Sequence, residues 1–252
     1  MTEKNNILAG DFEAGDFDEL EASFETGELD LDDFFDMEQE ADVNTRFIKP
    51  PQFKPKPELW KNAKRTAAKI NIEPGMAYFG IMDGSFIFGD LLEAIFTQKL
   101  IRAHRMDITT LSMSQENIDS LATLLLKGYV KELNLTVSDY FYAHERKSLV
   151  PYIQQELDID NRFQLAVSGN HTKTIAAQLT NGIHLVFHGS ANLRSSGNLE
   201  QVMIQDSKEL YDFITGINDR VIEKFKTINK SVRRAKLWHG VVEEDAEDQD
   251  SE

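Results

Sequence analysis

The chain contains no cysteine and no long apolar segment. Without cysteine, no disulfide can cross-link the fold, and no thiolate can act as a nucleophile or a metal ligand. No apolar run reaches about 18 residues, the length that a membrane-spanning helix requires. Residues 1–5 also lack the basic start and the apolar core of a secretion signal. These absences predict a soluble protein of the cytoplasm that has no membrane partner.

Basic residues are scarce at both ends of the chain. Residues 1–45 hold 16 acids and one lysine, and residues 243–252 hold seven acids and no base. Removing both ends from the totals of 43 acids and 27 bases leaves 20 acids and 26 bases. The body is therefore basic, although the whole chain has a net charge of −16. A basic body suits a polyanionic partner, although folded domains also vary by several charges with no function attached.

The composition divides the chain into four parts. Residues 1–45 hold scattered apolar residues among many acids, which predicts a disordered or conditionally folding arm. This arm could mimic a polyanion, dock a partner or only solubilise the chain. Residues 46–75 indicate a basic, proline-rich linker followed by a short helix over 58–70. Residues 76–230 are expected to form the folded domain, and residues 231–252 a basic and then acidic tail.

Short apolar strands alternate with helical stretches from residue 76 onward. Strands are expected at 76–82, 107–113, 131–137 and 163–168, and helices at 86–98, 116–129, 145–157 and 206–230. Asn181-Gly182 is a strong signal for a hairpin, here between strands 174–179 and 183–188. This alternation predicts an α/β fold with a mixed, largely parallel sheet that is flanked by helices on both faces.

One segment gathers several side chains that suit phosphodiester chemistry. Its residues are His171, Lys173, Gly189, Ser190, Asn192, Asn198 and Glu200. Residues two apart in a strand share a face, so His171 and Lys173 are expected to point at one spot. Ser190 and Asn192 are expected to approach the same spot from the other hairpin arm. An imidazole, an ammonium group and two neutral donors would suit a phosphodiester. Gly189 would let the substrate approach closely, and Glu200 would hold the tautomer of an imidazole.

This ordered set resembles the signature of the phospholipase D superfamily. The matching features are His-x-Lys, a hairpin, Gly-Ser-x-Asn and a trailing Asn-x-Glu, within a likeness that covers about residues 76–230. The stretches 137–141 and 189–196 also resemble phage and prophage members of the superfamily. The resemblance implies a phospholipase D-like fold and a phosphohistidine mechanism that needs no metal ion or other cofactor.

The resemblance also implies a role for each matching residue. His171 would be the nucleophile or the general acid, Lys173 and Asn192 would bind phosphate oxygens, and Glu200 would orient a histidine. Ser190 belongs to the same catalytic set. The substrate-binding residues expected around this set are Gly189, Arg194, Ser195, Ser196 and Asn198.

The segment departs from the family pattern in two ways. Gln178 stands where the family usually carries an aspartate, a supporting residue. Ten residues separate Gln178 from Gly189, where the common number is near six. An extension of four residues that is divided evenly over both arms of the hairpin keeps each side chain on its own face. The geometry of the set is therefore expected to survive.

The chain holds a single His-x-Lys, whereas the family mechanism joins two motifs in one site. We therefore expect a symmetric homodimer in which both His171 side chains meet. One imidazole would attack phosphorus and the other would protonate the leaving oxygen.

The leading interpretation is a metal-independent phosphodiesterase, a nuclease whose partner is DNA or RNA. Its expected location is the cytoplasm or, for a phage protein, the host cytoplasm or the virion. The competing interpretation is a catalytically silent phospholipase D-like protein that binds nucleic acid or serves as a phage structural protein. A variant of the nuclease interpretation is an enzyme that residues 1–45 hold inactive.

Overall fold

The structure of this chain is a computed structural model that describes residues 55–194 and 197–227. The strands in this part are β1 (Pro57–Trp60), β2 (Ala77–Met82), β3 (Ala103–Thr110), β4 (Val130–Ser138), β5 (Phe163–Ser168), β6 (Thr174–Leu179), β7 (His184–Gly189) and β8 (Glu200–Asp206). The helices are α3 (Ala63–Lys69), α4 (Phe88–Lys99), α5 (Gln115–Leu126), α6 (Asp139–Glu145), α7 (Leu149–Leu157) and α8 (Lys208–Phe225).

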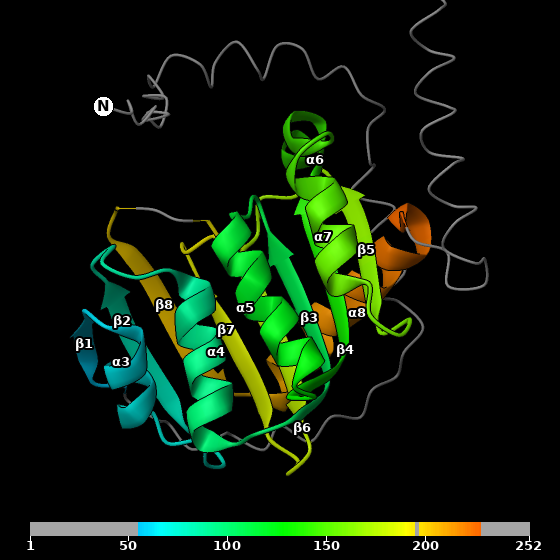
Figure 1. The fold of residues 1–252 in the computed structure, drawn as a ribbon. Coiled ribbons are helices and arrows are strands. Elements are labelled where there is room, and N and C mark those ends of the chain that lie inside the picture. The colour runs from blue at the N-terminus through cyan, green and yellow to red at the C-terminus, as the bar shows by residue number, and fades with distance from the viewer. Residues whose placement is uncertain (1–54, 195–196, 228–252) are drawn as a thin grey trace, which may run out of the picture. The chain divides into compact units, whose positions relative to one another are not determined.

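The strands of the described ranges form one sheet in the order β1-β2-β8-β7-β6-β3-β4-β5. The pairs β1–β2, β3–β4 and β4–β5 are parallel, and the pairs between them are antiparallel. Only β6 and β8 therefore run against the common direction of the described strands. This confirms the predicted mixed, largely parallel sheet (Figure 1). The carboxyl ends of the codirectional strands and the amino ends of β6 and β8 share one edge, which we call the site edge.

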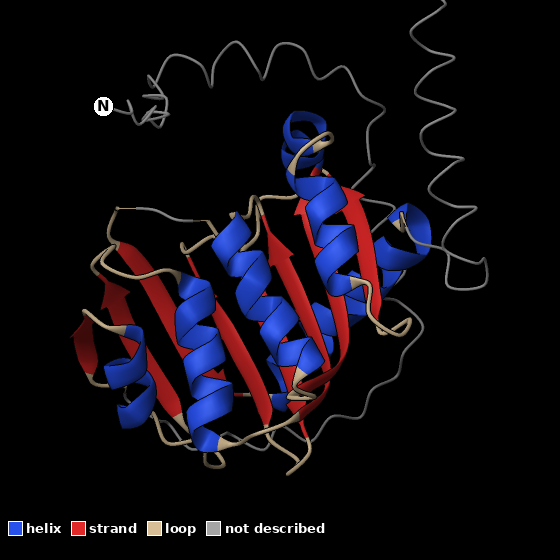
Figure 2. Cartoon of the chain, viewed as in Figure 1, coloured by secondary structure: helices blue, strands red, loops and turns tan. Residues whose placement is uncertain are grey.

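Helices cover both faces of the sheet, as predicted. In Figures 1 and 2, α3, α4, α5 and α7 lie in front of the sheet and α8 lies behind it. The main core fills the front layer, where α4 fully buries Leu91, Leu92, Ile95 and Phe96. Apolar residues at this helical spacing fall on one face, which explains why α4 packs flat against its neighbours. The smaller core behind the sheet consists of Ala176, Val186, Tyr211 and Ile214.

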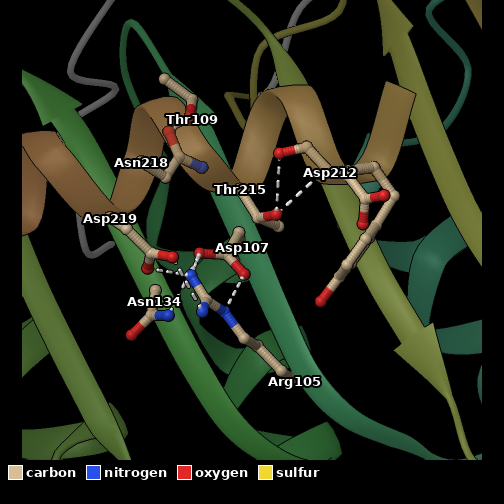
Figure 3. Close-up of polar contacts among 9 residues, drawn as sticks. Arg105, Asp107, Thr109, Asn134, Asp212, Thr215, Asn218 and Asp219 are labelled. Carbon is tan, nitrogen blue, oxygen red and sulfur yellow. Dashed lines mark hydrogen bonds and ion pairs between the residues drawn. The ribbon is translucent and has the colours of Figure 1, made fainter. Parts of the chain in front are cut away.

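A polar network ties α8 to the sheet (Figure 3). Arg105 pairs with Asp107 through two contacts of 2.6 and 2.7 Å, and it reaches Asp219 of α8 at 2.5 Å. Asn134 donates to Asp107 from β4 over 3.1 Å. Burial raises the pKa of Asp107, while the hydrogen bonds from Arg105 and Asn134 oppose that rise. The buried carboxylate thus depends on its partners to remain charged.

The predicted helix over 58–70 is wrong in its first part. Residues Pro57–Trp60 are strand β1, which pairs with β2, and the helix begins only after Asn62. The Asn62 side chain caps that helix by accepting from the Arg65 amide over 2.9 Å. Trp60 is buried against Gly80, where an added Cβ would lie 2.1 Å from the indole. A long-range contact therefore outweighs local helix propensity, and the sheet begins well before the predicted boundary at residue 76.

Further elements differ from the sequence prediction. The helix expected over 145–157 begins only at Leu149, as α7. Helix α6 precedes it and was not predicted; it starts where the Ser138 hydroxyl accepts from the Phe141 amide. Strand β3 begins and ends earlier than the predicted 107–113. Strand β8 was not predicted at all, although it joins β2 to β7. The predicted arm over 1–45, the tail over 231–252 and the last residues of the helix over 206–230 lie outside the described residues.

Candidate active site

The five predicted catalytic residues lie at the site edge, on three adjacent strands or directly beside them. His171 and Lys173 lead into β6, Ser190 and Asn192 follow β7, and Glu200 opens β8. Since β6, β7 and β8 are neighbours in the sheet, segments up to 29 residues apart meet at one place. Open α/β sheets bind ligands at such an edge, outside the carboxyl ends of their strands.

The side chains of His171 and Lys173 are in direct contact. The Lys173 ammonium group lies 3.2 Å from Nδ1 of His171 and donates to the His171 carbonyl oxygen over 2.7 Å. An ammonium group can only donate, so Nδ1 would be the acceptor in this contact, and a neutral ring would then carry its proton on Nε2. Burial lowers the pKa of Lys173, and the negative charge of Glu200 opposes this shift. The Lys173 ammonium group is thus within the electrostatic reach of Glu200.

Ser190 and Glu200 form the second pair of the site. The Ser190 hydroxyl donates to Glu200 Oε2 over 2.5 Å and accepts from the Gln201 amide over 2.9 Å. Both residues were expected at the site, but Glu200 was expected to bind an imidazole. Within the described chain its side-chain partner is Ser190, while the imidazole of His171 contacts Lys173. The carboxylate therefore positions a hydroxyl here.

Strand β3 orients Asn192. Its Oδ1 accepts from the Leu111 amide over 3.2 Å and lies 3.4 Å from the Thr110 hydroxyl. The Leu111 amide can only donate, so the amide oxygen of Asn192 must face β3 and its NH₂ group must face away. The Thr110 hydroxyl also accepts from the Leu193 amide over 3.3 Å. The backbone around Asn192 is thereby tied to the end of β3.

Asn170 gives the His171 segment a similar anchor. Its Oδ1 accepts from the amide and the hydroxyl of Thr172 over 2.9 and 2.7 Å, and its Nδ2 donates to the Thr110 carbonyl over 3.4 Å. Sequence reasoning missed Thr110, Leu111 and Asn170 as supports of the site. Thr110 is one of several polar residues of β3, and no local pattern in the sequence connects it to Asn192.

Gly189 has a different role from the predicted one. An added Cβ would lie 2.0 Å from the Gln201 carbonyl oxygen and 3.1 Å from the Val202 Cα. The neighbouring strand β8 fills the space that was expected for the substrate. Gly189 is therefore required for the close approach of β7 and β8, which brings Ser190 to Glu200.

Two of the remaining predicted substrate-binding residues lie beside the predicted catalytic set. Arg194 and Asn198 line a hollow together with Asn192 and Glu200. Ser195 and Ser196 lie outside the described residues. In the ranges that the structure covers, His, Asp and Glu side chains do not gather in a group of three or more that could hold a metal ion. Nor is any helix there long and apolar enough to cross a lipid bilayer.

Gln178 lies away from the site. It pairs with His184 near the far end of β6, five residues or about 17 Å along the chain from Lys173. Its replacement of the usual aspartate therefore removes no group from the catalytic set.

Neither the known family models nor the curated proteins include a match to this chain. Among solved structures, Nuc from Salmonella typhimurium, described as a phospholipase D family member, has 14% identity and a TM-score of 0.42 over 58% of this chain and 93% of that one. Phosphatidylserine synthase from Haemophilus influenzae has 13% identity and a TM-score of 0.44 over 62% of this chain and 40% of that one.

Yeast tyrosyl-DNA phosphodiesterase, in its H432N form, has 20% identity and a TM-score of 0.32 over 51% of this chain and 31% of that one. Because all three similarities are this distant, the activities of these proteins are not transferred to this chain.

Proposed function

We propose that this chain is a metal-independent phosphodiesterase that cleaves nucleic acid through a histidine nucleophile. The observation that carries the proposal is the meeting of His171, Lys173, Ser190, Asn192 and Glu200 at one sheet edge. This set supplies a nucleophile, a cation for the non-bridging oxygens and neutral donors, as attack on phosphorus requires. The basic body between the acidic ends of the chain favours a polyanionic substrate.

In the first step, a ring nitrogen of His171 attacks phosphorus. A P–N bond forms, the P–O bond to the leaving group breaks, and the leaving oxygen takes a proton from a general acid. Attack by Nε2 needs the ring proton on Nδ1, whereas the contact with Lys173 places it on Nε2. Lys173 therefore has to leave Nδ1 before the attack. In the second step, water attacks the phosphohistidine, the deprotonated general acid takes the proton of that water, and the P–N bond breaks to regenerate the imidazole.

We propose that a second copy of the chain supplies the general acid. A single chain contributes one His-x-Lys, so the second imidazole would be His171 of the other protomer across a two-fold axis. Mixing active chains with His171→Ala chains tests this arrangement. If the site is shared, mixed dimers should lose activity, so that activity falls more steeply than the fraction of active chains. A linear fall would show that each chain acts alone.

The test of the activity is nicking of plasmid and single-stranded DNA, and of RNA, by the full chain in excess EDTA. Activity should survive the chelator and vanish in His171→Ala. The matched control is His104→Ala, because His104 is an exposed histidine at the opposite end of β3. Cleavage that EDTA abolishes, or that His171→Ala retains, would refute the proposal.

The second candidate is a silent phospholipase D-like protein that binds nucleic acid without turnover. The resting contact between Lys173 and His171, in which the ring nitrogen Nδ1 is occupied, is the observation that favours it. It predicts nucleic-acid binding by the wild-type chain with no nicking under any condition. Binding that is weakened by Lys173→Ala would then place the nucleic acid at the same site.

A further inference from the structure

Helix α8 covers only part of the sheet face on which it packs. In Figure 1 it lies behind β3, β4 and β5, away from β1 and β2, and it packs mainly on β5, β6 and β7. Residues that pair across neighbouring strands point to the same face of a sheet. Starting from Val186, which lies in the core beneath α8, the pairing places five apolar side chains of β1, β2 and β8 on this face: Leu59, Ala77, Phe79, Ile81 and Met203. We call these five residues the open face.

The open face is exposed and carries no charge. Leu59 is 53% exposed, and the other four side chains are partly exposed and belong to neither core of the described chain. Their neighbours on the same face, Pro57, Gln201 and Gln205, are also uncharged. The centre of a protein–protein interface is likewise apolar and depleted of charged residues, and a contiguous exposed apolar patch marks such a surface. The open face therefore has the composition of a contact surface.

A second apolar stripe runs along α8 itself. Its buried side packs on the sheet, and four further apolar residues recur along another side at spacings of three and four. They are partly or largely exposed, and we call them the α8 stripe: Leu210, Phe213, Ile217 and Val221. Asp219 lies on the side of α8 opposite to this stripe and reaches Arg105, near the end of β3 that is remote from the site edge. The α8 stripe therefore faces the site edge.

We propose that the open face and the α8 stripe bind a second copy of the same chain. The covered and the open parts of this sheet face differ in height by one helix, so the face has a ridge beside a step. A two-fold rotation sets the ridge of each copy on the step of the other, and every contact then occurs twice. Phe213, which is 60% exposed on the ridge, would thereby become buried.

The same two-fold axis would assemble the shared site, and this step rests on the proposed function. Rotation about an axis parallel to the strands preserves their direction, so both site edges lie at one end of the dimer. His171 leads into β6, and β6 and β7 are the two central strands of the sheet. His171 therefore lies beside this axis, where the single His-x-Lys of the chain requires a second imidazole. A segment of the same chain on the open face would not meet that requirement.

The test is the mass of the full chain in solution, measured by analytical ultracentrifugation for the wild type and Phe213→Asp. The wild type should be a dimer at micromolar concentration. In Phe213→Asp the dissociation constant should rise at least about a hundredfold, because the axis buries the new carboxylate twice. Leu59→Lys places a charge on the other half of the same contact and should act alike. Leu126→Asp is the matched control, since Leu126 is 66% exposed on α5 across the sheet, and it should leave the dimer intact.

Two results of this measurement would overturn the proposal. One is a monomeric wild type. The other is a dimer that withstands both Phe213→Asp and Leu59→Lys, because another surface would then hold the two copies together.

A single introduced cysteine shows what covers the open face, since the chain contains no cysteine of its own. The rate at which a maleimide labels Met203→Cys in the full chain should fall as the protein concentration rises through the dissociation constant. Leu126→Cys is the control and should be labelled at one rate throughout. Slow labelling of Met203→Cys that persists in the monomer would assign the cover to another segment of the same chain. Fast labelling at every concentration would mean that nothing covers the face, and both results overturn the proposal.

The activity of these variants separates this inference from the proposed catalysis. A dimer that Phe213→Asp dissociates with loss of cleavage supports both. Dissociation without loss of cleavage per chain supports the contact surface and refutes the shared site. Dissociation of a wild-type dimer that never cleaves nucleic acid supports the contact surface and refutes the proposed catalysis.

Discussion

The Lys173 ammonium group lies 3.2 Å from Nδ1 of His171. One contact thereby links the proposed nucleophile to the group that is expected to bind the phosphate oxygens. An ammonium group has three N–H donors, so Lys173 can bind a phosphate oxygen whether or not it keeps this contact. Attack by Nε2 requires the ring proton on Nδ1, so the contact with Nδ1 must break before the attack. The proposed role of Lys173 can be tested through its protonation.

The pH dependence of cleavage should report on Lys173. Burial lowers the pKa of Lys173, so its ammonium group loses the proton at a lower pH than an ordinary lysine does. Activity should therefore fall as the pH rises, and the midpoint of this fall should lie below about 10.5. Lys173→Arg keeps the positive charge to higher pH, since a guanidinium has a pKa above about 12. The alkaline limb of the kcat/KM profile should therefore move upward in Lys173→Arg. An unchanged limb would assign it to another group.

Thr110→Val should reduce catalysis by disturbing Asn192. The substitution removes the hydroxyl that accepts from the Leu193 amide and lies 3.4 Å from Asn192 Oδ1. We expect kcat to fall about tenfold or more, because a small displacement of a positioned group is costly, and stability to fall by about 1–2 kcal/mol. Thr110→Ser keeps the hydroxyl and should restore kcat. A loss of stability with an unchanged kcat would make Thr110 a purely structural residue.

Gly189→Ala should destabilise the fold. The new Cβ would lie 2.0 Å from the Gln201 carbonyl oxygen, so β7 and β8 must separate, at a cost of about 1–3 kcal/mol. Gly216→Ala is the control, because its added Cβ in α8 would meet no atom within 4 Å beyond its chain neighbours and the backbone of the helix itself, and it should stabilise by about 0.5–1 kcal/mol. Urea denaturation of both variants measures the difference. Equal stability of the two would contradict the close approach of the strands.

Arg105→Met should destabilise the fold more than Asp219→Asn does. It leaves Asp107 buried without its bidentate partner, which costs about 3 kcal/mol or more, whereas Asp219 is 57% exposed. The loss of stability caused by Arg105→Met should shrink at acid pH. Arg105 opposes the rise that burial causes in the pKa of Asp107, so its removal raises that pKa further. The folded variant therefore binds a proton at Asp107 at a higher pH than the folded wild type does, and it regains stability as the carboxyl protonates.

Urea denaturation of Arg105→Met and the wild type at about pH 7.5 and about pH 5 provides the measurement. The difference in unfolding free energy between the two proteins is compared at each pH, which removes the titration of other groups. If the difference in unfolding free energy were the same at both pH values, Asp107 in the folded variant would be either protonated throughout this range or exposed to water.

The sequence by itself determined the alternating α/β elements, the hairpin at Asn181-Gly182 and the order of the chemical groups from His171 to Glu200. Each of these depends on residues that are close in the chain. Periodicity and turn chemistry act over such distances, so local patterns predict them. Strand β1 was not predicted, because local propensity favours a helix there. The strand depends on pairing with β2, where Trp60 packs against Gly80, twenty residues away in the chain.

Only the tertiary structure decided how the chemical groups are held. The bond from the Leu111 amide to Asn192 spans 81 residues, and no pattern in either segment encodes it. Gly189 and Glu200 have other contacts in the structure than the sequence predicted, because β8 lies against β7. The Gln201 carbonyl lies against Gly189, and the Ser190 hydroxyl donates to Glu200. Contacts of this kind follow from which strands become neighbours, and that choice depends on the packing of the whole sheet.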